Sequence, residues 1–339
     1  MFCTVGCLSN LTEFIKYPYP RQVRFIGRAL GKRLVARADR SWGLATAQLA
    51  AGPALCLDVD GCLYRLADLA AACGRRAPNA VADLLADWSS SQSLLRDLAQ
   101  SARSGAAAAI DTTGAELLAP IAPGKVLCAG ANYYDHMAEM GFPDVKKETQ
   151  RLFFFFKPAR HAVVGPGKTV EMPRGTTMFD WEIELAAVVG KRARYVTAAE
   201  ALDHVAGYTI AIDLSARDFN RAPDQFYKFD WVAGKAIDTG CPMGPVIVTA
   251  DAIGDPQNLG LKLWVNGELK QDSRTSMMIY SVAEQIARAS EIMTLDPGDV
   301  LLTGTPAGVG VPKGTFLKIG DRIDAEIEHV GRLSVTVRT

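Results

Sequence analysis

The most informative segment of the chain is FDWEIELAAVVGK, residues 179–191. Its apolar run contains β-branched residues and stops at a glycine, which predicts a buried strand. Glu182 and Glu184 interrupt the start of this run two positions apart, and alternate residues of a strand share one face. Two carboxylates beside an apolar run repel each other and are poorly solvated. A divalent cation would relieve both problems, so the segment predicts a metal site; a solvated strand face is the alternative.

A third carboxylate follows a second apolar run. Residues 207–213, GYTIAID, are typical of a buried strand that ends at Asp213. Together with Glu182 and Glu184 it forms an all-oxygen set, which suits Mg²⁺, Mn²⁺ or Ca²⁺ rather than zinc or copper. Three carboxylates leave about three positions of a six-coordinate ion open, which favours a catalytic site over a structural one.

Composition narrows the class of protein. The 339 residues contain 37 Lys plus Arg and 37 Asp plus Glu. A net charge of zero argues against a nucleic-acid or anionic-membrane partner. The chain has neither an apolar stretch of membrane-spanning length nor the N-terminal pattern of a signal peptide. Seven scattered cysteines without a C-x-x-C pair predict reduced thiols and no zinc site, and we expect a cytoplasmic protein.

The chain divides near a proline-rich segment at residues 118–123. Residues 1–22 resemble an N-terminal extension. Residues 23–117 predict a small αβ domain with short strands at 23–26 and 34–38, a hairpin around 58–61 and three helices between 66 and 101. Residues 118–339 would form the metal-binding catalytic domain. There we predict helices at 196–205 and 282–293, and a type I′ hairpin at Asn266-Gly267.

Two further segments of this domain carry groups suited to chemistry. Residues 130–141, GANYYDHMAEMG, predict a short helix on which His136 and Glu139 share a face. A histidine oriented by a carboxylate can act as a general base; an exposed turn with incidental charges is the alternative. Lys157 ends the aromatic strand 153–156 and could face the site, although a surface lysine is the commoner role. Lys235 lies in a glycine-punctuated loop.

From residue 125 to its end, the chain resembles the catalytic domain of the fumarylacetoacetate hydrolase family. The motifs that carry the resemblance occur in family order: GANYYDHMAEMG, FFFKP, FDWEIELAAVVGK, GYTIAIDLSARD, GKAIDTGCPMGP, WVNGELKQ and PGDVLLTGTPAGVG. The resemblance implies an α+β, mostly β fold: a mixed β-sheet roll with a metal at its mouth. Its ligands would be Glu182, Glu184 and Asp213. The N-terminal part resembles the small, variable domain of longer members.

The resemblance also implies roles for other residues. It implies a helical lid carrying His136 and Glu139 that orders over the substrate, and it makes Lys235 the active-site lysine. Long eukaryotic members have a further acidic metal ligand close to the position of Asn132, and an amide here leaves three protein carboxylates.

Four residues are candidates for substrate binding. Arg217 and Asn220 fall where family members contact substrate, and Thr305 lies in the loop that binds the keto-acid carboxylate. Lys157 completes this group.

The family's substrates are mostly β-diketo or α-keto acids. The resemblance therefore implies Mg²⁺- or Mn²⁺-dependent hydrolysis of a C–C bond in an acylpyruvate- or fumarylpyruvate-like acid, in the catabolism of aromatic or related compounds. His136 would activate a water, and Lys235 would stabilise the oxyanion. The same site could instead decarboxylate, isomerise or tautomerise oxaloacetate-like or hydroxymuconate-like keto diacids; a non-catalytic metal-binding scaffold is a third possibility. Family members commonly form homodimers, so we expect one here.

Overall fold

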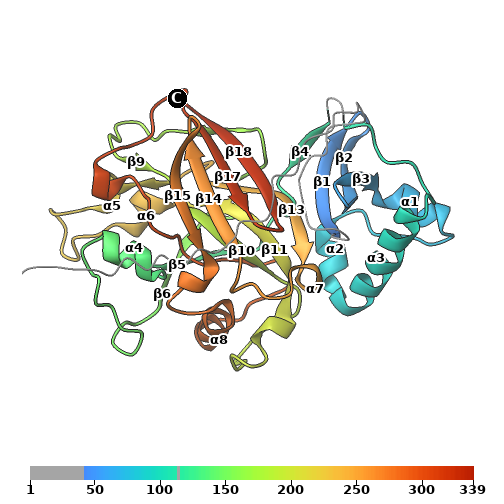
Figure 1. Ribbon diagram of the computed structural model, residues 1–339, viewed down its shortest axis with the longest axis horizontal. Helices are drawn as coiled ribbons and strands as arrows, with labels where there is room; N and C mark the ends of the chain where they lie inside the picture. Colours follow the sequence, from blue (N-terminus) through green and yellow to red (C-terminus); the bar gives the residue numbers. More distant parts are fainter. Residues whose placement is uncertain (1–41, 113–114) are drawn as a thin grey trace, which may run out of the picture. The chain divides into compact units, whose positions relative to one another are not determined.

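The computed structural model describes residues 42–112 and 115–339 (Figure 1). The extension predicted at 1–22 and the strands predicted at 23–26 and 34–38 lie outside these residues. In the described part, the chain combines mixed sheets with short helices, which confirms the expected α+β class. No helix of this part has the length and apolar character that a membrane span requires. The five described cysteines are free thiols.

The largest sheet has eleven strands in the order β3-β2-β1-β13-β11-β10-β16-β5-β6, with β4 beside β1 and β7 beside β13. It is mixed, because β5 runs parallel to β16 and β7 runs parallel to β13. Its strands are β1 (Trp42–Leu49), β2 (Gly52–Val59), β3 (Cys62–Arg65), β4 (Glu116–Leu118), β5 (Val126–Gly130), β6 (Phe153–Lys157), β7 (Val163–Val164), β10 (Ile183–Val189), β11 (Val205–Ile212), β13 (Cys241–Thr249) and β16 (Val300–Leu302).

Two smaller sheets complete the β structure. A five-stranded sheet has the order β15-β14-β17-β18-β8, and β9 pairs with β12. Asn266 and Gly267, with φ of 52° and 83°, join β14 to β15, as the type I′ prediction requires. The strands are β8 (Thr169–Glu171), β9 (Phe179–Asp180), β12 (Ser215–Ala216), β14 (Gly260–Val265), β15 (Glu268–Arg274), β17 (Arg322–Ile327) and β18 (Gly331–Arg338).

Most helices are short connections. The predicted helix at 282–293 is confirmed as α8, which starts with a capping box between Ser281 and Glu284. The helices are α1 (Leu66–Ala72), α2 (Val81–Ala86), α3 (Trp88–Arg103), α4 (Tyr134–Glu139), α5 (Arg217–Asn220), α6 (Trp231–Lys235), α7 (Ala250–Ile253) and α8 (Val282–Ile292), with 3₁₀ turns at Ala201–His204, Thr275–Met277 and Val311–Lys313.

The helix predicted at 196–205 is wrong. Only Ala201–His204 form a 3₁₀ turn, and Val205 already opens β11. The reason is tertiary, because Val205 pairs with Val189 of β10 and continues the central sheet. The side chain of Thr197 donates to Glu200.

Strand β10 separates two hydrophobic cores. Ile183, Leu185 and Ala187 face a core shared with the five-stranded sheet, whereas Ala186 and Val188 face a core shared with α1, α2 and α3. All seven residues of β10 are buried, as expected of a strand covered on both faces. Glu184 belongs to the even-numbered face, so it continues the second core toward the polar end of the strand.

The predicted small αβ part is present, and it adds its strands to the same large sheet. β1 pairs antiparallel with β13, with Leu44 opposite Ile247. Figure 1 shows α1, α2 and α3 beside β1, β2 and β3. The domain boundary between residues 117 and 118 stays a prediction.

Candidate metal and catalytic site

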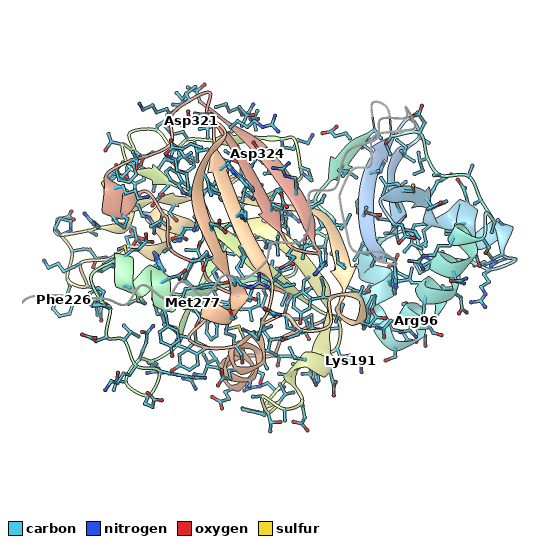
Figure 2. All side chains as sticks on the ribbon, viewed as in Figure 1. Arg96, Lys191, Phe226, Met277, Asp321 and Asp324 are labelled. Carbon is cyan, nitrogen blue, oxygen red and sulfur yellow. The ribbon has the colours of Figure 1, made fainter. Side chains whose placement is uncertain are left out.

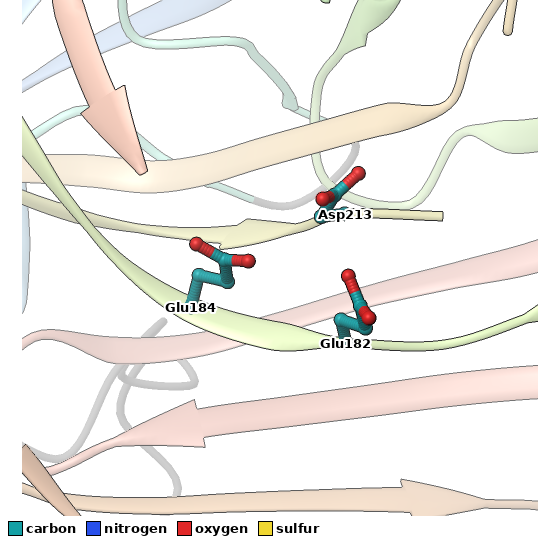
Figure 3. A group of neighbouring side chains, drawn as sticks. All are labelled: Glu182, Glu184 and Asp213. Atoms are coloured by element: carbon teal, nitrogen blue, oxygen red, sulfur yellow. The ribbon is translucent and has the colours of Figure 1, made fainter. Parts of the chain in front are cut away.

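Three carboxylates meet at the polar ends of β10 and β11. Glu182, Glu184 and Asp213 each offer an oxygen, and these oxygens all lie within 4.8 Å of one another. Figure 3 shows the three side chains projecting into a common space. The backbone brings them together, because the Asp213 amide donates to the carbonyl of Glu182 at 2.8 Å across the strand pair. All three are buried, with 5%, 1% and 0% of their surface exposed.

Buried cations surround this acidic cluster. Lys235 Nζ lies 2.5 Å from Glu182 Oε2 and 2.6 Å from Asp213 Oδ2. Arg217 donates to the other oxygen of Glu182 at 2.5 Å and to Asp180 at 2.9 Å. Such buried ion pairs hold their geometry only when each charge has a partner, so the carboxylates are fixed in place.

The surroundings treat the two glutamates differently. Burial raises the pKa of Glu184 well above its ordinary value, and the negative charges of Asp213 and Glu182 raise it further. Burial also acts to raise the pKa of Glu182, but Arg217 and Lys235 outweigh it and lower that pKa. The ionised form of Glu184 is therefore repelled by the charges of Asp213 and Glu182, and a bound cation would relieve this repulsion.

The predicted histidine–carboxylate pair exists on α4. His136 Nδ1 lies 2.8 Å from Glu139 Oε1, and Glu139 Oε2 accepts from the Gly308 amide at 2.8 Å. The carboxylate therefore links the imidazole to the glycine-rich loop after β16. Because Nδ1 is engaged, the other ring nitrogen of His136 remains for proton exchange.

The predicted residues converge on one cavity of about 130 Å³. All of them line it except Glu139 and Lys157. Glu139 contacts Nδ1 of His136 and thereby orients the imidazole. The lining members of the predicted set are Glu182, Glu184, Asp213, His136, Lys235, Arg217, Asn220 and Thr305.

The candidate substrate contacts are already engaged. Arg217 is occupied by two carboxylates. Asn220 donates to the carbonyl of Asp230 at 3.1 Å. Thr305 donates to the carbonyl of Ile183 at 2.8 Å. Their assignment as substrate ligands stays a prediction.

Lys157 differs from both of its predicted roles. It is 2% exposed, so it is not a surface lysine. Its ammonium donates to Asp213 Oδ1 at 2.6 Å, the carbonyl of Lys235 at 2.6 Å and the carbonyl of Leu214 at 3.0 Å. Because an ammonium has three donors, none is left for a substrate. Lys157 instead positions Asp213.

Asn132 does not supply a fourth ligand. Its amide nitrogen donates to the carbonyls of Tyr280 and Thr303, at 3.0 and 2.9 Å, and its oxygen accepts from the Tyr280 amide at 2.9 Å. The side chain therefore joins three chain segments and does not face the cavity.

Several site residues were not predicted from the sequence. Asp180 is fully buried against Arg217, and its position two residues before Glu182 was a usable signal, since alternate residues share a face. The Gly304 amide, which donates to Glu184 Oε2 at 2.6 Å, has no side-chain signal. Phe153, Phe155 and Trp231 line the cavity, but aromatic residues in a strand usually indicate core.

The model of the family described as fumarylacetoacetate (FAA) hydrolase C-terminal matches residues 125–338. That match covers more than half of the chain. The chain belongs to the fumarylacetoacetate hydrolase family.

Relatives in this family include oxaloacetate tautomerases. The chain is 45% identical over 221 residues to "Oxaloacetate tautomerase fahd2, mitochondrial" of Xenopus laevis, covering 64% of this chain and 67% of that protein. It is 44% identical over 219 residues to "Oxaloacetate tautomerase FAHD2B, mitochondrial" of Homo sapiens, covering 63% and 67%.

Solved structures of the family share the fold. A fumarylacetoacetate hydrolase from Exiguobacterium antarcticum has a TM-score of 0.72 and 32% identity, and the match covers 88% of this chain and all of that one. A 2-hydroxyhepta-2,4-diene-1,7-dioate isomerase from Mycobacterium marinum has a TM-score of 0.65 and 31% identity, and the match covers 88% of this chain and 98% of that one. A fumarylpyruvate hydrolase from Pseudomonas aeruginosa, in complex with Mn²⁺ and pyruvate, has a TM-score of 0.58 and 35% identity. The match covers 66% of this chain and 91% of that one. The family thus contains isomerases and hydrolases, and this chain is an enzyme of the family with an acidic metal site.

Proposed function

We propose that the protein is a metal-dependent keto–enol tautomerase of oxaloacetate-like 2-oxo acids. One observation carries the proposal: His136, held by Glu139, lines the same cavity as the buried acidic cluster. A base beside a site that can stabilise an enolate is what proton transfer next to a carbonyl needs. The relatives named oxaloacetate tautomerases support this reaction over the C–C hydrolysis that we expected first from the sequence.

The donor set fits a hard divalent cation. Glu182, Glu184 and Asp213 would hold Mg²⁺ or Mn²⁺, with Ca²⁺ as the remaining candidate. The raised pKa of Glu184 supports this fit, since two neighbouring carboxylates disfavour its ionised form in the absence of a further positive charge. When bound, the cation would polarise the 2-oxo group and stabilise the negative charge of the enolate.

The residues of the chain account for the proton transfers. His136 Nε2 removes a proton from C3 of the keto acid, and the electron pair of that C–H bond forms the C2–C3 double bond. The 2-oxo oxygen takes up the negative charge and then a proton from solvent. Glu139 stabilises the imidazolium, which returns its proton to solvent.

Lys235 supplies a permanent positive charge beside the reacting atoms. Burial would lower the pKa of Lys235, but Asp213 and Glu182 outweigh burial and raise that pKa, so the ammonium stays charged at neutral pH. Its charge stabilises the developing enolate.

The test measures ketonisation of enol-oxaloacetate by the loss of its ultraviolet absorbance, with and without Mg²⁺ or Mn²⁺. We expect metal-dependent turnover. His136→Ala should lower kcat by roughly 10²–10⁴-fold, the usual share of general-base assistance, while Mg²⁺ binding measured by calorimetry persists. His161→Ala, which removes an exposed imidazole, is the matched control and should leave the rate unchanged. Near-normal turnover by His136→Ala would show that the base is assigned wrongly.

Hydrolysis remains the second candidate because the same His136–Glu139 pair could activate a water. The fumarylpyruvate hydrolase from Pseudomonas aeruginosa is 35% identical to this chain. Product analysis by NMR separates the two reactions. An acylpyruvate would yield a carboxylic acid and pyruvate only if a C–C bond is hydrolysed, and carbon dioxide from oxaloacetate would indicate decarboxylation.

The cellular setting stays a set of predictions. A cytoplasmic location and a homodimer are expected from the sequence alone. The Xenopus and human relatives carry "mitochondrial" in their names, so organelle fractionation is the measurement that separates the two locations.

A further inference from the structure

The cavity has an aromatic wall that the proposed proton transfer does not use. Phe153, Phe155 and Trp231 line the same space as the three carboxylates. Trp231 stacks on Phe155, with ring centroids 5.3 Å apart and planes 20° apart, and its ring lies 5.3 Å from that of Phe153. Phe229 stacks on Trp231, with ring centroids 5.9 Å apart and ring planes 13° apart. Because Trp231 and Phe229 are 38% and 49% exposed, the stack runs from the cavity to the surface.

The position of this wall is set by close backbone contacts. A Cβ atom at Gly130 would lie 2.1 Å from Phe153, so the glycine lets that ring lie against the chain of β5. A Cβ at Gly234 would lie 2.4 Å from the Cβ of Asn220, so α6 packs tightly on α5. The wall is therefore a fixed surface rather than a loose cluster of side chains.

The wall and the active-site ammonium belong to one helix. Trp231 and Lys235 stand four residues apart on α6, and residues at this spacing share a helix face. Asp230 caps the helix by accepting from the Ala233 amide. Lys235 Nζ also lies 5.0 Å from the centroid of Phe155. A substrate whose head lies beside Lys235 therefore has ring faces within reach.

The charged residues that line the cavity are the other groups that a substrate would meet beside the aromatic wall. Lys235 is paired with Glu182 and Asp213, and Arg217 with Asp180 and Glu182. Among the described residues that line the cavity, no lysine or arginine lacks such a partner. A flat apolar group on the far end of a substrate would find ring faces there.

We propose that this aromatic wall, with Trp231 as its central residue, selects 2-oxo acids that carry a planar, uncharged aromatic or unsaturated group on C3. The inference rests on the proposed tautomerase function and defines the substituent that its site prefers. Arylpyruvates and oxaloacetate share the carboxylate, the 2-oxo group and a C3 hydrogen, so the proton transfer is the same for both. They differ in what C3 presents to Trp231.

The experiment compares enol-phenylpyruvate with enol-oxaloacetate in the presence of Mg²⁺. We expect the wild-type protein to have the higher kcat/KM for phenylpyruvate. Trp231→Ala should lower the ratio of the two kcat/KM values about tenfold, since an aromatic pair contributes roughly two- to tenfold beyond its buried area. Trp231→Phe should keep the ratio within about threefold. If Trp231→Ala does not fold, Trp231→Leu keeps an apolar side chain without a ring and allows the same comparison.

Phe226→Ala is the matched control. Phe226 lies in the loop between α5 and α6 and is labelled in Figure 2; it is 88% exposed and does not line the cavity. Its removal deletes an aromatic ring near the same helix and should leave the ratio unchanged. An equal drop in Phe226→Ala would mean that the loop, and not the wall, sets the preference.

A binding measurement separates failure of this inference from failure of the proposed function. Calorimetry with Mg²⁺ should show phenylpyruvate binding about tenfold more tightly than pyruvate, with the difference lost in Trp231→Ala. If neither enol is turned over but this binding preference holds, the tautomerase proposal is wrong and the wall is correctly assigned. If oxaloacetate is turned over while Trp231→Ala changes neither ratio, the wall does not select the substrate.

Discussion

Lys157 and Lys235 each contact a different carboxylate oxygen of Asp213. Lys157 contacts Oδ1 and Lys235 contacts Oδ2, both at 2.6 Å. Both lysines and the aspartate are almost completely buried. In such a setting each charge is stable only because its partners are present, and removal of one partner leaves an uncompensated charge.

The first prediction concerns Lys157→Met, which keeps most of the length of the side chain and removes its charge. We expect the metal-free protein to lose about 3–5 kcal/mol in free energy of unfolding, the usual effect of breaking a buried pair. Urea denaturation followed by circular dichroism measures this loss. Lys146→Met, at an exposed position, is the control and should stay within about 0.5 kcal/mol of the wild type. A stable Lys157→Met protein with only a raised KM would restore the substrate-binding role.

The second prediction concerns the proton on Glu184. Burial, Asp213 and Glu182 raise the pKa of this carboxyl, whereas a metal ligand must be deprotonated. Metal binding should therefore release a proton, and metal affinity should rise with pH until the pKa of Glu184 is passed. Below that pKa, each pH unit should weaken binding about tenfold.

Calorimetry of Mg²⁺ binding in two buffers of different ionisation enthalpy measures this proton release. In Glu184→Gln the buffer-dependent heat should disappear and Mg²⁺ should bind more weakly. Equal heats in both buffers for the wild-type protein would contradict the assignment of the bound proton to Glu184.

At the scale of elements, the segment that carries His136 is tied down at several points. The hydroxyl of Tyr280 lies within hydrogen-bond distance of the carbonyls of Lys147 and Gln150, and its single proton is shared between them. Lys147 lies 2.5 Å from Glu284 of α8, and Gln150 donates to the carbonyl of Ala131 at 2.6 Å. The loop after α4 is thus fastened beside the start of α8, and its position sets that of the base.

The third prediction is that Tyr280→Phe loosens this loop. The lost hydrogen bond is worth about 0.5–1.5 kcal/mol, so hydrogen exchange of residues 140–152 should accelerate several-fold. We expect kcat to fall more than KM rises, because the loosened loop would hold His136 in position less often. Exchange mass spectrometry measures the effect. Tyr195→Phe, at a 69% exposed position, should leave exchange of this loop unchanged, and unaltered exchange in Tyr280→Phe would show that its hydroxyl does not fasten the loop.

The elements that the sequence predicts well are those with a local cause. The Asn266-Gly267 turn needs positive φ at both residues, and α8 carries its capping box within four residues. The segment 196–205 has a helical pattern, but its last residue, Val205, pairs with Val189 of β10, which lies elsewhere in the chain.

Site residues follow the same rule. The strand alternation of Glu182 and Glu184, the strand end at Asp213 and the helical spacing of His136 and Glu139 can all be read locally, and the family motifs decide between the alternatives that these patterns leave open. The role of Lys157 depends on Asp213, 56 residues away, and that of Asn132 on Tyr280, 148 residues away. A pattern along one segment contains no information on such a partner, so a surface lysine was the reasonable interpretation for Lys157.

On the scale of the whole molecule, the N-terminal helices and the metal cluster share one face of the central sheet. Ala186 and Val188 of β10 pack in the core formed with α1, α2 and α3, and Glu184 continues the same face. β1 also covers the edge of β13 by pairing with it. The part of the fold that matches the family therefore packs against residues that precede the match.

The last prediction is that residues 118–339 alone do not form a stable metal site. Such a fragment would expose the edge of β13 and the core residues that α1, α2 and α3 cover, among them Ala186 and Ile247. We expect aggregation or a broad, non-cooperative urea transition, and weak Mg²⁺ binding by calorimetry. A soluble fragment with the urea midpoint and Mg²⁺ affinity of the full chain would show that the boundary near residue 118 separates two independent domains.

A graded version of this test keeps the chain intact. Leu98 of α3 is 1% exposed in the shared core, whereas Leu202 is 38% exposed. Leu98→Ala should lower the free energy of unfolding by about 2–5 kcal/mol, the usual effect of a buried leucine truncation, and Leu202→Ala should change it by less than about 0.5 kcal/mol. If the core and the cluster form one cooperative unit, saturating Mg²⁺ should raise the urea midpoint of Leu98→Ala. If α1, α2 and α3 unfold separately, Mg²⁺ should leave their transition unchanged.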